Sequence, residues 1–281
     1  MQIVRDLETL QQAVAELRGS GGAIAFVPTM GALHAGHMAL VEEARRRASH
    51  VVASIFVNPT QFGPNEDLSR YPRREAGDAQ MLEAAGVDIL WAPDVATMYP
   101  KGPEITVCAG PLGDLLDGAA RPGHFDGVAT VVARLFDQVR PDFALFGEKD
   151  YQQLLVIRAM TAALALPVEI VGIPTQRDAD GLALSSRNLY LTEEERRAAR
   201  GLPRALGEAA AAIQAGGDVA ESVAAARDKL ARAGFEPIDY VELRDAATLA
   251  PMAALDRPGR LLAAAKIGQT RLIDNLPVAP A

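Results

Sequence analysis

Short apolar runs alternate with segments of helical periodicity through the first part of the chain, and this alternation restricts the folds that the chain can adopt. The runs that we expect to form strands one to five span residues 23–27, 51–57, 87–91, 142–146 and 168–173. The helical segments that we expect among them span residues 36–49, 73–85, 124–139 and 151–166. Strands and helices in alternation are typical of α/β proteins.

Such an alternation predicts a parallel sheet with helices on both faces. Because crossovers between parallel strands are right-handed, few topologies remain. We expect a Rossmann-like, doubly wound sheet of strand order 3-2-1-4-5. Strands one and four are then neighbours at the switch point of the sheet, where ligands bind in such folds.

The pattern changes in the C-terminal part. Residues 176–190 are polar and contain glycine, which indicates a loop or hinge. Thr192 and Glu195 match a capping box that opens a helix. The elements expected beyond are Ala-rich helices over 193–215 and 219–233, strand-like runs over 238–243 and 260–267, and an extended tail from Thr270. We therefore predict two domains, 1–175 and a smaller α+β domain over 176–281.

The composition limits the partners that the protein can bind and the cellular compartment in which we expect it. A formal net charge of -8 argues against non-specific nucleic-acid binding, which depends on clustered Lys and Arg. We expect no membrane partner, since the most apolar stretch, residues 161–174, is too short to span a bilayer. The N-terminus carries no apolar segment of a secretory signal. A single cysteine, Cys108, allows no internal disulfide, which fits a reducing, cytoplasmic location. Residues 105–108 resemble a strand, so we interpret Cys108 as a small buried apolar residue rather than a nucleophile.

Four polar clusters each follow a predicted strand and therefore lie at the carboxyl edge of the sheet. The first contains Gly31, His34, Gly36 and His37. The glycines let a phosphate approach the backbone, and the helix that starts here offers N–H groups at its positive end. The two histidines are three residues apart and share a face, so both can donate hydrogen bonds to phosphate oxygens. Capping or packing histidines, or paired zinc ligands, are the alternatives.

The other clusters offer amides, a lysine and a hydroxyl–guanidinium group. Residues 58–63 place amides beside an aromatic ring, which suits a neutral polar substrate or a plain loop. Lys149 lies at a helix start, where its charge is unfavourable unless an anion lies between the ammonium and the helix. A solvated surface lysine is the alternative. Ser185, Ser186 and Arg187 indicate a mobile phosphate clamp or a polar hinge. The predicted strand order brings Lys149 to the same crevice as the two histidines.

Five motifs lie in order along the chain: PTMGALHAGH (28–37), FVNPTQF (56–62), RPGHFDGV (121–128), FGEKDYQQ (146–153) and LSSRN (184–188). The first is similar to the HxGH signature of nucleotidyl transferases and class I aminoacyl-tRNA synthetases. As a set, in this order, they resemble the pantothenate synthetase (pantoate–β-alanine ligase) family, and the similarity runs nearly from end to end.

This resemblance implies a Rossmann-like domain that binds ATP and pantoate, a mobile C-terminal lid, a homodimer and dependence on Mg²⁺ with ATP. It implies that pantoate contacts Gln61, Gln153 and Met30, and that β-alanine contacts Gln61. The residues that it places around ATP are Met30, Gly31, His34, Gly36, His37, Gly147, Lys149, Asp150, Gln176, Leu184, Ser185, Ser186 and Arg187. The family often has an aliphatic residue where this chain has Gln176. The backbone of that residue contacts adenine in the family. The family often has several acids in a row near residue 78, where this chain has Gly77 before Asp78, the candidate metal ligand.

The resulting hypothesis is a two-step ligase. The carboxylate of pantoate attacks the α-phosphorus of ATP and displaces pyrophosphate, and the amine of β-alanine then attacks pantoyl adenylate and releases AMP. Because the carboxylate is already ionised, the site supplies positioning and charge stabilisation. The expected catalytic residues are His34, His37, Lys149 and Arg187, with His37 as a proton donor. The groups expected to receive the methyl groups of pantoate are Met30, Phe62, Val128 and Val132.

Three other functions share some of these features. A tRNA synthetase also carries HxGH, but it normally has a longer chain and a basic surface. A nucleotidylyltransferase transfers AMP or CMP to a phosphate and leaves a dinucleotide. A non-catalytic nucleotide sensor binds ATP without turning it over.

Overall fold

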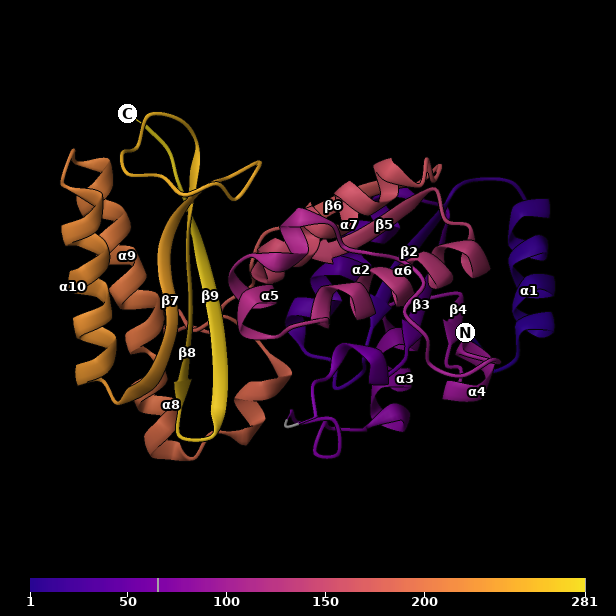
Figure 1. The fold of residues 1–281 in the computed structure, drawn as a ribbon. Coiled ribbons are helices and arrows are strands. Elements are labelled where there is room, and N and C mark those ends of the chain that lie inside the picture. The colour runs from indigo at the N-terminus through magenta and orange to yellow at the C-terminus, as the bar shows by residue number, and fades with distance from the viewer. Residues whose placement is uncertain (65, 281) are drawn as a thin grey trace. The chain divides into compact units, whose positions relative to one another are not determined.

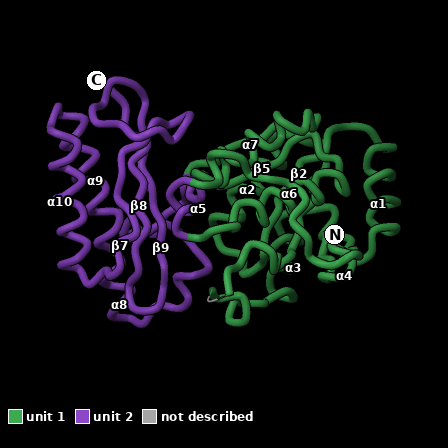
Figure 2. Tube along the Cα trace, viewed as in Figure 1, with its two compact units in different colours: residues 1–114, 121–148, 152–174 green, residues 115–120, 149–151, 175–281 purple. Residues whose placement is uncertain are grey.

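The computed structural model describes residues 1–64 and 66–280, and the chain forms two units, which Figure 2 shows in different colours. The first comprises Met1–Asp114, Arg121–Glu148 and Gln152–Pro174. The second comprises Leu115–Ala120, Lys149–Tyr151 and the chain from Thr175 onward. Two short segments of the N-terminal part therefore pack with the C-terminal unit. The predicted roles of the two domains, and the motion of a lid, stay predictions.

A parallel sheet organises the first unit (Figure 1). Within the described residues it has six strands in the order β1-β4-β3-β2-β5-β6, and every pairing is parallel. The strands are β1 (Gln2–Val4), β2 (Ile24–Thr29), β3 (His50–Ile55), β4 (Ile89–Trp91), β5 (Phe143–Gly147) and β6 (Glu169–Ile173). The predicted strands one to five correspond to β2 to β6, so the predicted order 3-2-1-4-5 and the doubly wound fold are confirmed. The apolar pattern does not predict the short edge strand β1.

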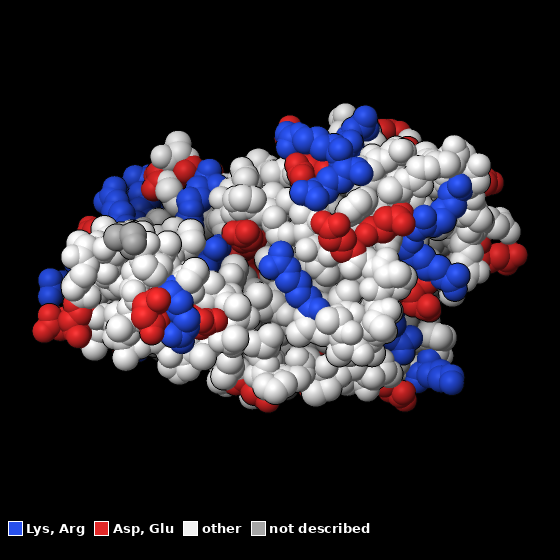
Figure 3. All heavy atoms as spheres, turned by 90° about the horizontal axis from the view of Figure 1, so that it is seen from above, with Lys and Arg blue, Asp and Glu red and all other residues white. Residues whose placement is uncertain are grey.

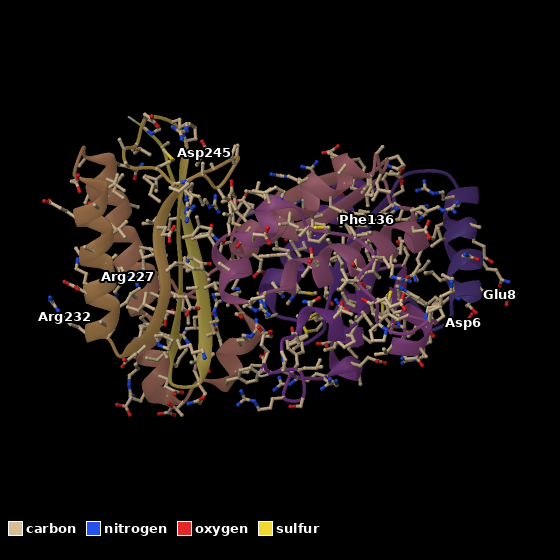
Figure 4. All side chains as sticks on the ribbon, in the orientation of Figure 1. Asp6, Glu8, Phe136, Arg227, Arg232 and Asp245 are labelled. Atoms are coloured by element: carbon tan, nitrogen blue, oxygen red, sulfur yellow. The ribbon has the colours of Figure 1, made fainter. Side chains whose placement is uncertain are left out.

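Successive residues of β2 point to opposite faces of the sheet, and helices cover both faces. Ile24 and Phe26 face one core, and Ala25 and Val27 face the other. The first core includes residues of α1 (Leu7–Gly19), α6 (His124–Val139) and α7 (Tyr151–Ala163), and the second includes residues of α2 (Ala35–Arg47) and α3 (Glu75–Ala84). Phe136 of α6, labelled in Figure 4, packs edge-on against Phe26 with ring centroids 6.4 Å apart. Burial on both faces explains why these strands are continuous apolar runs in the sequence.

Shorter elements connect the layers. They are α4 (Val95–Met98), α5 (Leu116–Ala120) and the 3-10 turns η1 (Pro59–Gln61), η2 (Pro111–Asp114), η3 (Glu148–Asp150) and η4 (Ser186–Tyr190). The turn η1 follows β3, and η3 follows β5, so both lie next to the carboxyl ends of central strands.

The second unit is an antiparallel sheet packed against helices. In its described residues the strand order is β7-β8-β9. The strands are β7 (Phe235–Asp245), β8 (Gly259–Ile267) and β9 (Thr270–Val278), and the helices are α8 (Glu193–Ala199), α9 (Gly201–Gln214) and α10 (Val219–Arg232). Figure 1 shows α9 and α10 along one face of this sheet, with which they share an apolar core. The predicted capping box is present, because Thr192 Oγ1 accepts a hydrogen bond from Glu195 N and Glu195 Oε2 accepts one from Thr192 N.

Two local predictions are wrong. The expected single helix over 193–215 is broken at Arg200, and α9 begins at Gly201. Pro203 lies in the first turn of α9, where a missing N–H costs little, so it favours a new helix start. Residues 105–108 form no strand, and Cys108 is exposed rather than buried. Thr130 Oγ1, and not a neighbouring strand, accepts the backbone N–H of Thr106 and of Val107.

No helix in the described part of the chain combines the length and apolarity that a bilayer crossing needs. Figure 3 shows acidic side chains interspersed among the basic ones on the face that it presents.

Candidate active site

The loop between β2 and α2 holds the first predicted cluster in a left-handed turn. Gly31 has a φ of +82°, and Ala32 follows with a φ of +52°. A Cβ added to Gly31 would lie 3.1 Å from Asp78 Oδ2 and 3.2 Å from Ile55 Cγ2, which leaves little room for a side chain. Thr29 Oγ1 accepts a hydrogen bond from Gly31 N at 3.1 Å and so closes the turn. The path of this loop therefore depends on glycine at residue 31.

Asp78 braces the same loop from α3. Its Oδ2 accepts a hydrogen bond from Ala32 N at 2.8 Å, and its Oδ1 accepts one from Leu33 N at 2.9 Å. The residue is 3% exposed and lies in the first turn of α3, where the helix dipole favours a negative charge. Both carboxylate oxygens thus bind backbone N–H groups. The metal-ligand role of Asp78 is untested, and the geometry assigns it to holding the loop.

His34 and His37 cap helix α2 through their Nδ1 atoms. His34 Nδ1 accepts a hydrogen bond from Gly36 N at 3.1 Å, and His37 Nδ1 accepts one from His34 N at 3.3 Å. The two ring centroids are 4.1 Å apart. A neutral imidazole that accepts at Nδ1 carries its proton on Nε2, so the caps fix both rings as Nε2–H donors. Capping, one of the alternatives, is therefore present, and it is compatible with phosphate binding because the two roles use different ring nitrogens.

A buried polar network holds the amide of Gln61 after β3. Asn58 Nδ2 donates to Gln61 Oε1 at 3.0 Å, and Asn58 Oδ1 accepts from Tyr99 Oη at 2.7 Å and from Thr60 Oγ1 at 2.9 Å. Burial raises the pKa of Tyr99, so its hydroxyl stays protonated and can donate. With its oxygen bound by Asn58, Gln61 directs Nε2 toward Met30 Sδ, 3.3 Å away. Gln61 therefore presents a hydrogen-bond donor beside Met30.

Helix α6 packs closely against this network. A Cβ on Gly127 would lie 2.3 Å from Thr60 O, so only glycine permits the approach. The carbonyl of Gly127 accepts a hydrogen bond from Asn58 Nδ2 at 3.2 Å. The RPGHFDGV motif therefore carries a glycine that the packing of η1 against α6 requires.

Arg121 and His124 of the same motif fix the backbone of Gln61. Arg121 Nε and Nη2 each donate to the carboxylate of Glu66 at 2.6 Å, and Arg121 Nη1 lies 2.9 Å from His124 Nε2. Since arginine only donates, His124 Nε2 accepts, and its Nδ1–H donates to Gln61 O at 2.8 Å. Burial opposes the charge of Glu66, but the hydrogen bonds from Arg121 outweigh it and lower the pKa of Glu66. A charge-assisted chain thus holds η1 in place.

Lys149 belongs to the second unit by its packing, although it follows β5 in the chain. Its ammonium lies 3.5 Å from Asp150 Oδ1, and its carbonyl accepts a hydrogen bond from Asn275 Nδ2 at 2.9 Å. Local hydrogen bonds hold the backbone of the predicted loop over 176–190. Leu184 N donates to Gln176 O, Arg187 N donates to Ser185 Oγ, and residues 186–190 form η4.

The first unit brings part of the predicted site together. The loop of Met30, His34 and His37 lies at the carboxyl end of β2, and Gln61 follows the neighbouring strand β3. Gly147 ends β5, which pairs with β2 on its other side. Gln153 lies half-buried in the first turn of α7. The predicted residues in the second unit are Lys149, Asp150, Gln176, Leu184, Ser185, Ser186 and Arg187. Their convergence with the first group stays a prediction.

Comparison with known proteins decides the family. A profile of the pantoate-beta-alanine ligase family matches residues 2–277 of the chain. The chain belongs to this family. The resemblance predicted from the five motifs is therefore confirmed.

Relatives in this family match the chain over its full length. A pantothenate synthetase from Rhizorhabdus wittichii is 66% identical over 281 residues, with 100% of both chains covered. The crystal structure of pantothenate synthetase from Thermus thermophilus matches with a TM-score of 0.94 and 50% identity, again with 100% of both chains covered. The pantoate-beta-alanine ligase from Francisella tularensis, complexed with Beta-gamma ATP and Beta-alanine, matches with a TM-score of 0.83 and 33% identity over 98% of this chain and 97% of that chain.

Three residues have roles here that the motifs do not predict. Asp78 braces the loop after β2, Tyr99 orients Asn58, and Asn58 orients Gln61. Asn58 lies inside the motif FVNPTQF, so the sequence identified the residue as a candidate but did not predict that it orients Gln61. Tyr99 lies in a segment with no polar cluster. Only its hydrogen bond to Asn58 in the folded chain identifies it.

Proposed function

We propose that this protein joins pantoate to β-alanine at the expense of ATP, through a pantoyl adenylate, and releases AMP and pyrophosphate. The observation that carries the proposal is the pair of Nε2–H imidazoles at the start of α2, which follows β2, together with the Gln61 amide, which follows the neighbouring strand β3. Membership of the pantoate-beta-alanine ligase family supports the same assignment.

In the first step, a carboxylate oxygen of pantoate forms a bond to the α-phosphorus of ATP, and the bond between that phosphorus and the pyrophosphate oxygen breaks. Negative charge builds up on the phosphate oxygens during this transfer. The positive end of the α2 dipole and the Nε2–H groups of His34 and His37 stabilise that charge. Gly31 and Gly36 let the phosphates approach the backbone.

In the second step, the neutral amine of β-alanine attacks the acyl carbonyl of the adenylate, the bond from the carbonyl carbon to the phosphate oxygen breaks, and AMP leaves. The attacking nitrogen loses one proton to the solvent. Nε2–H of His37 supports the leaving phosphate as a donor. Gln61 lies at the junction of the two substrates and contacts both pantoate and β-alanine.

The pantoate pocket joins donors to an apolar wall. Gln61 Nε2 and the amide of Gln153 bind the polar groups of pantoate, and Met30 contacts its methyl groups. Val128 and Val132 are 3% and 5% exposed and belong to the first core, so of the apolar groups expected to receive these methyl groups, the partly exposed Phe62 joins Met30 in the proposal.

The second unit supplies the remaining phosphate contacts in this proposal. Lys149 and Arg187 contribute charge, Ser185 and Ser186 contribute hydroxyl donors, and Asp150 and Gly147 flank the lysine. The backbone of Gln176 and Leu184 contacts the nucleotide. The unit acts as a lid that limits hydrolysis of the adenylate, and the protein works as a cytoplasmic homodimer.

Mg²⁺ enters this proposal with ATP. Within residues 1–64 and 66–280, no group of three or more His, Cys, Asp or Glu could hold a metal ion, and both oxygens of Asp78 accept backbone N–H groups. The proposal therefore names no protein ligand for the ion. The ATP phosphates therefore provide the ligands of the ion, as they commonly do for Mg²⁺.

Pyrophosphate exchange tests the proposed function. With ATP and labelled pyrophosphate, exchange should depend on pantoate and not on β-alanine, and AMP should be released only when β-alanine is added. Exchange that depends on a free amino acid would assign a tRNA synthetase, and a dinucleotide product without amine-dependent AMP release would assign a nucleotidylyltransferase. ATP binding in a calorimeter without any turnover would assign a nucleotide sensor.

A further inference from the structure

Asn275 of β9 holds the backbone of the lysine proposed to bind phosphate. Asn275 is 3% exposed, and its Nδ2 donates to Lys149 O at 2.9 Å. The segment Lys149–Tyr151 packs with the second unit, to which β9 belongs. A side chain of the C-terminal sheet therefore holds a segment that follows β5 in sequence.

Arg260 of β8 sets which atom of Asn275 faces the lysine. Arg260 Nε donates to Asn275 Oδ1 at 2.5 Å. Because arginine carries no acceptor, the amide oxygen must face Arg260, and Nδ2 is left to face Lys149 O. The Arg260 guanidinium also stacks on the ring of Tyr151, with 4.1 Å from Cζ to the ring centroid. Two neighbouring strands thus contact the same short segment.

The backbone of Asn275 is fixed in turn by an ion pair. Arg177 donates to both carboxylate oxygens of Asp274 at 2.8 Å and to Asn275 O at 3.2 Å. The side chain of Asp274 is 0% exposed. Arg177 also donates to Gly181 O at 3.0 Å, within the turn that leads to Ser185. The adjacent residues Asp274 and Asn275 therefore hold both the lysine segment and the serine–arginine turn.

We propose that Asn275 is a positioning residue for adenylate formation, acting through the backbone of Lys149. The inference rests on the proposed function, in which Lys149 binds the phosphates of ATP. A lysine side chain has four rotatable bonds, so a fixed backbone is needed to limit where its ammonium reaches. The same strand segment links that lysine to the turn of Ser185, which couples two groups that are far apart in sequence.

The variant Asn275→Asp tests the hydrogen bond from Asn275 Nδ2 to Lys149 O. Aspartate has nearly the same shape and keeps an oxygen for Arg260, but it places a second oxygen against Lys149 O in place of the N–H donor. We expect pantoate-dependent pyrophosphate exchange to fall by up to about 100-fold, the size seen when a reacting group is misplaced by an ångström. The KM for pantoate should stay unchanged, because the pantoate residues Gln61 and Met30 belong to the first unit.

The decisive measurement is a double-mutant cycle with Lys149→Ala. If Asn275 acts through Lys149, Asn275→Asp should change exchange by less than about 2-fold when the lysine side chain is absent. A multiplied loss in the double variant would overturn the positioning role. Near-normal exchange in Lys149→Ala alone would overturn the lysine assignment of the proposed function, which is a separate outcome.

Arg227→Met is the matched control. Arg227 of α10, labelled in Figure 4, donates to Ile238 O at 3.1 Å, so the variant also removes a side chain to carbonyl hydrogen bond in the second unit. It should lower Tm without changing exchange. If Asn275→Asp fails to fold by circular dichroism, Asn275→Ala removes the donor without adding charge and carries the same cycle. Equal exchange in Asn275→Ala and Arg227→Met would also overturn the proposal.

Discussion

The carboxylate of Asp78 accepts a hydrogen bond from the backbone N–H of Ala32 at 2.8 Å, and this bond ties α3 to the loop after β2. A second bond, from Leu33 N to the other oxygen, makes the contact bidentate. The carboxylate therefore sets the geometry of the turn that precedes the two capping histidines. It fixes the backbone of the loop that is proposed to bind phosphate.

Asp78→Asn should weaken ATP binding. An amide offers one oxygen and one NH₂ group, so one of the two backbone N–H groups loses its acceptor and faces a donor instead. We expect the KM for ATP to rise about 10-fold, which corresponds to ~1.4 kcal/mol. The free energy of unfolding should fall by about 1–3 kcal/mol, the usual cost of an unsatisfied buried group. Initial-rate kinetics and urea denaturation measure the two effects.

Asp88→Asn is the control for Asp78→Asn. Asp88 Oδ2 accepts a hydrogen bond from Val51 N at 2.7 Å, which is the same kind of contact at the amino end of β3. The control should lose stability and keep its KM for ATP. An equal rise of KM in both variants would mean that Asp78 acts only on overall stability.

Tyr99→Phe should weaken pantoate binding and spare ATP binding. Loss of the hydroxyl removes the 2.7 Å donor to Asn58 Oδ1, so the amide of Asn58 can rotate and release Gln61 Oε1. We expect the KM for pantoate to rise about 3- to 10-fold, as for the loss of one buried hydrogen bond. Steady-state kinetics with each substrate varied in turn measure this split.

Tyr240→Phe controls for the loss of a buried phenol. Tyr240 is 6% exposed and belongs to the second unit, whereas the Asn58 network belongs to the first. Its removal should leave the KM for pantoate unchanged. A rise in the KM for ATP of Tyr99→Phe that matches the rise for pantoate would contradict a role confined to Gln61.

The central sheet could be predicted from the sequence because its strands are buried on both faces and are therefore unbroken apolar runs. β1 has only three residues, Gln2–Val4, and carries no pattern that distinguishes it from a loop. Cys108 lies in an apolar stretch, but side-chain contacts with Thr130 hold that stretch, so periodicity gave the wrong structure. The local apolar pattern was sufficient to identify the strands, but it did not determine the conformation of the loops.

The site divides in the same way. Residues of the β2–α2 loop could be named as candidates from the sequence because their chemistry lies within one short motif. The braces could not, because each joins distant segments: Asp78 is 46 residues from Ala32, and Tyr99 is 41 residues from Asn58. The hydrogen bond that Lys149 O accepts likewise comes from a distant residue, Asn275, which is 126 residues away. Such pairs become visible only when the fold brings them together.

Lys149→Ala should slow adenylate formation without unfolding the protein. The lost group is a charged donor for the phosphates in the proposed function, and removal of one preorganised donor costs about 10²–10³ in rate. Pantoate-dependent pyrophosphate exchange measures the loss. Lys101→Ala, at an exposed lysine of the first unit, should exchange at the normal rate. A Lys149→Ala rate within about 2-fold of the unmodified protein would remove this lysine from the phosphate contacts.

The stability that Asp180 gives to the turn before Ser185 and Arg187 should depend on pH. Hydrogen bonds from Arg196, opposed by some burial and aided by Leu182 N and by Arg200, lower the pKa of Asp180 from 3.8 to about 2. Arg196 Nη1 and Arg200 Nε lie 2.7 and 2.9 Å from Asp180 Oδ2. The ion pairs therefore attach the start of this turn to α8.

The sign of the pH effect follows from the lowered pKa. Since the folded protein holds the Asp180 proton less tightly than the unfolded chain, the stabilisation is complete above about pH 4 and is lost as the pH falls toward 2. Asp180→Asn should lower the urea midpoint at pH 7, and its difference from the unmodified protein should shrink at pH 3. Asp228→Asn, at an exposed carboxylate of α10, serves as the control and should show a small difference at both pH values. A difference for Asp180→Asn that stays constant between pH 7 and pH 3 would mean that the variant acts through packing and not through the charge that Arg196 binds.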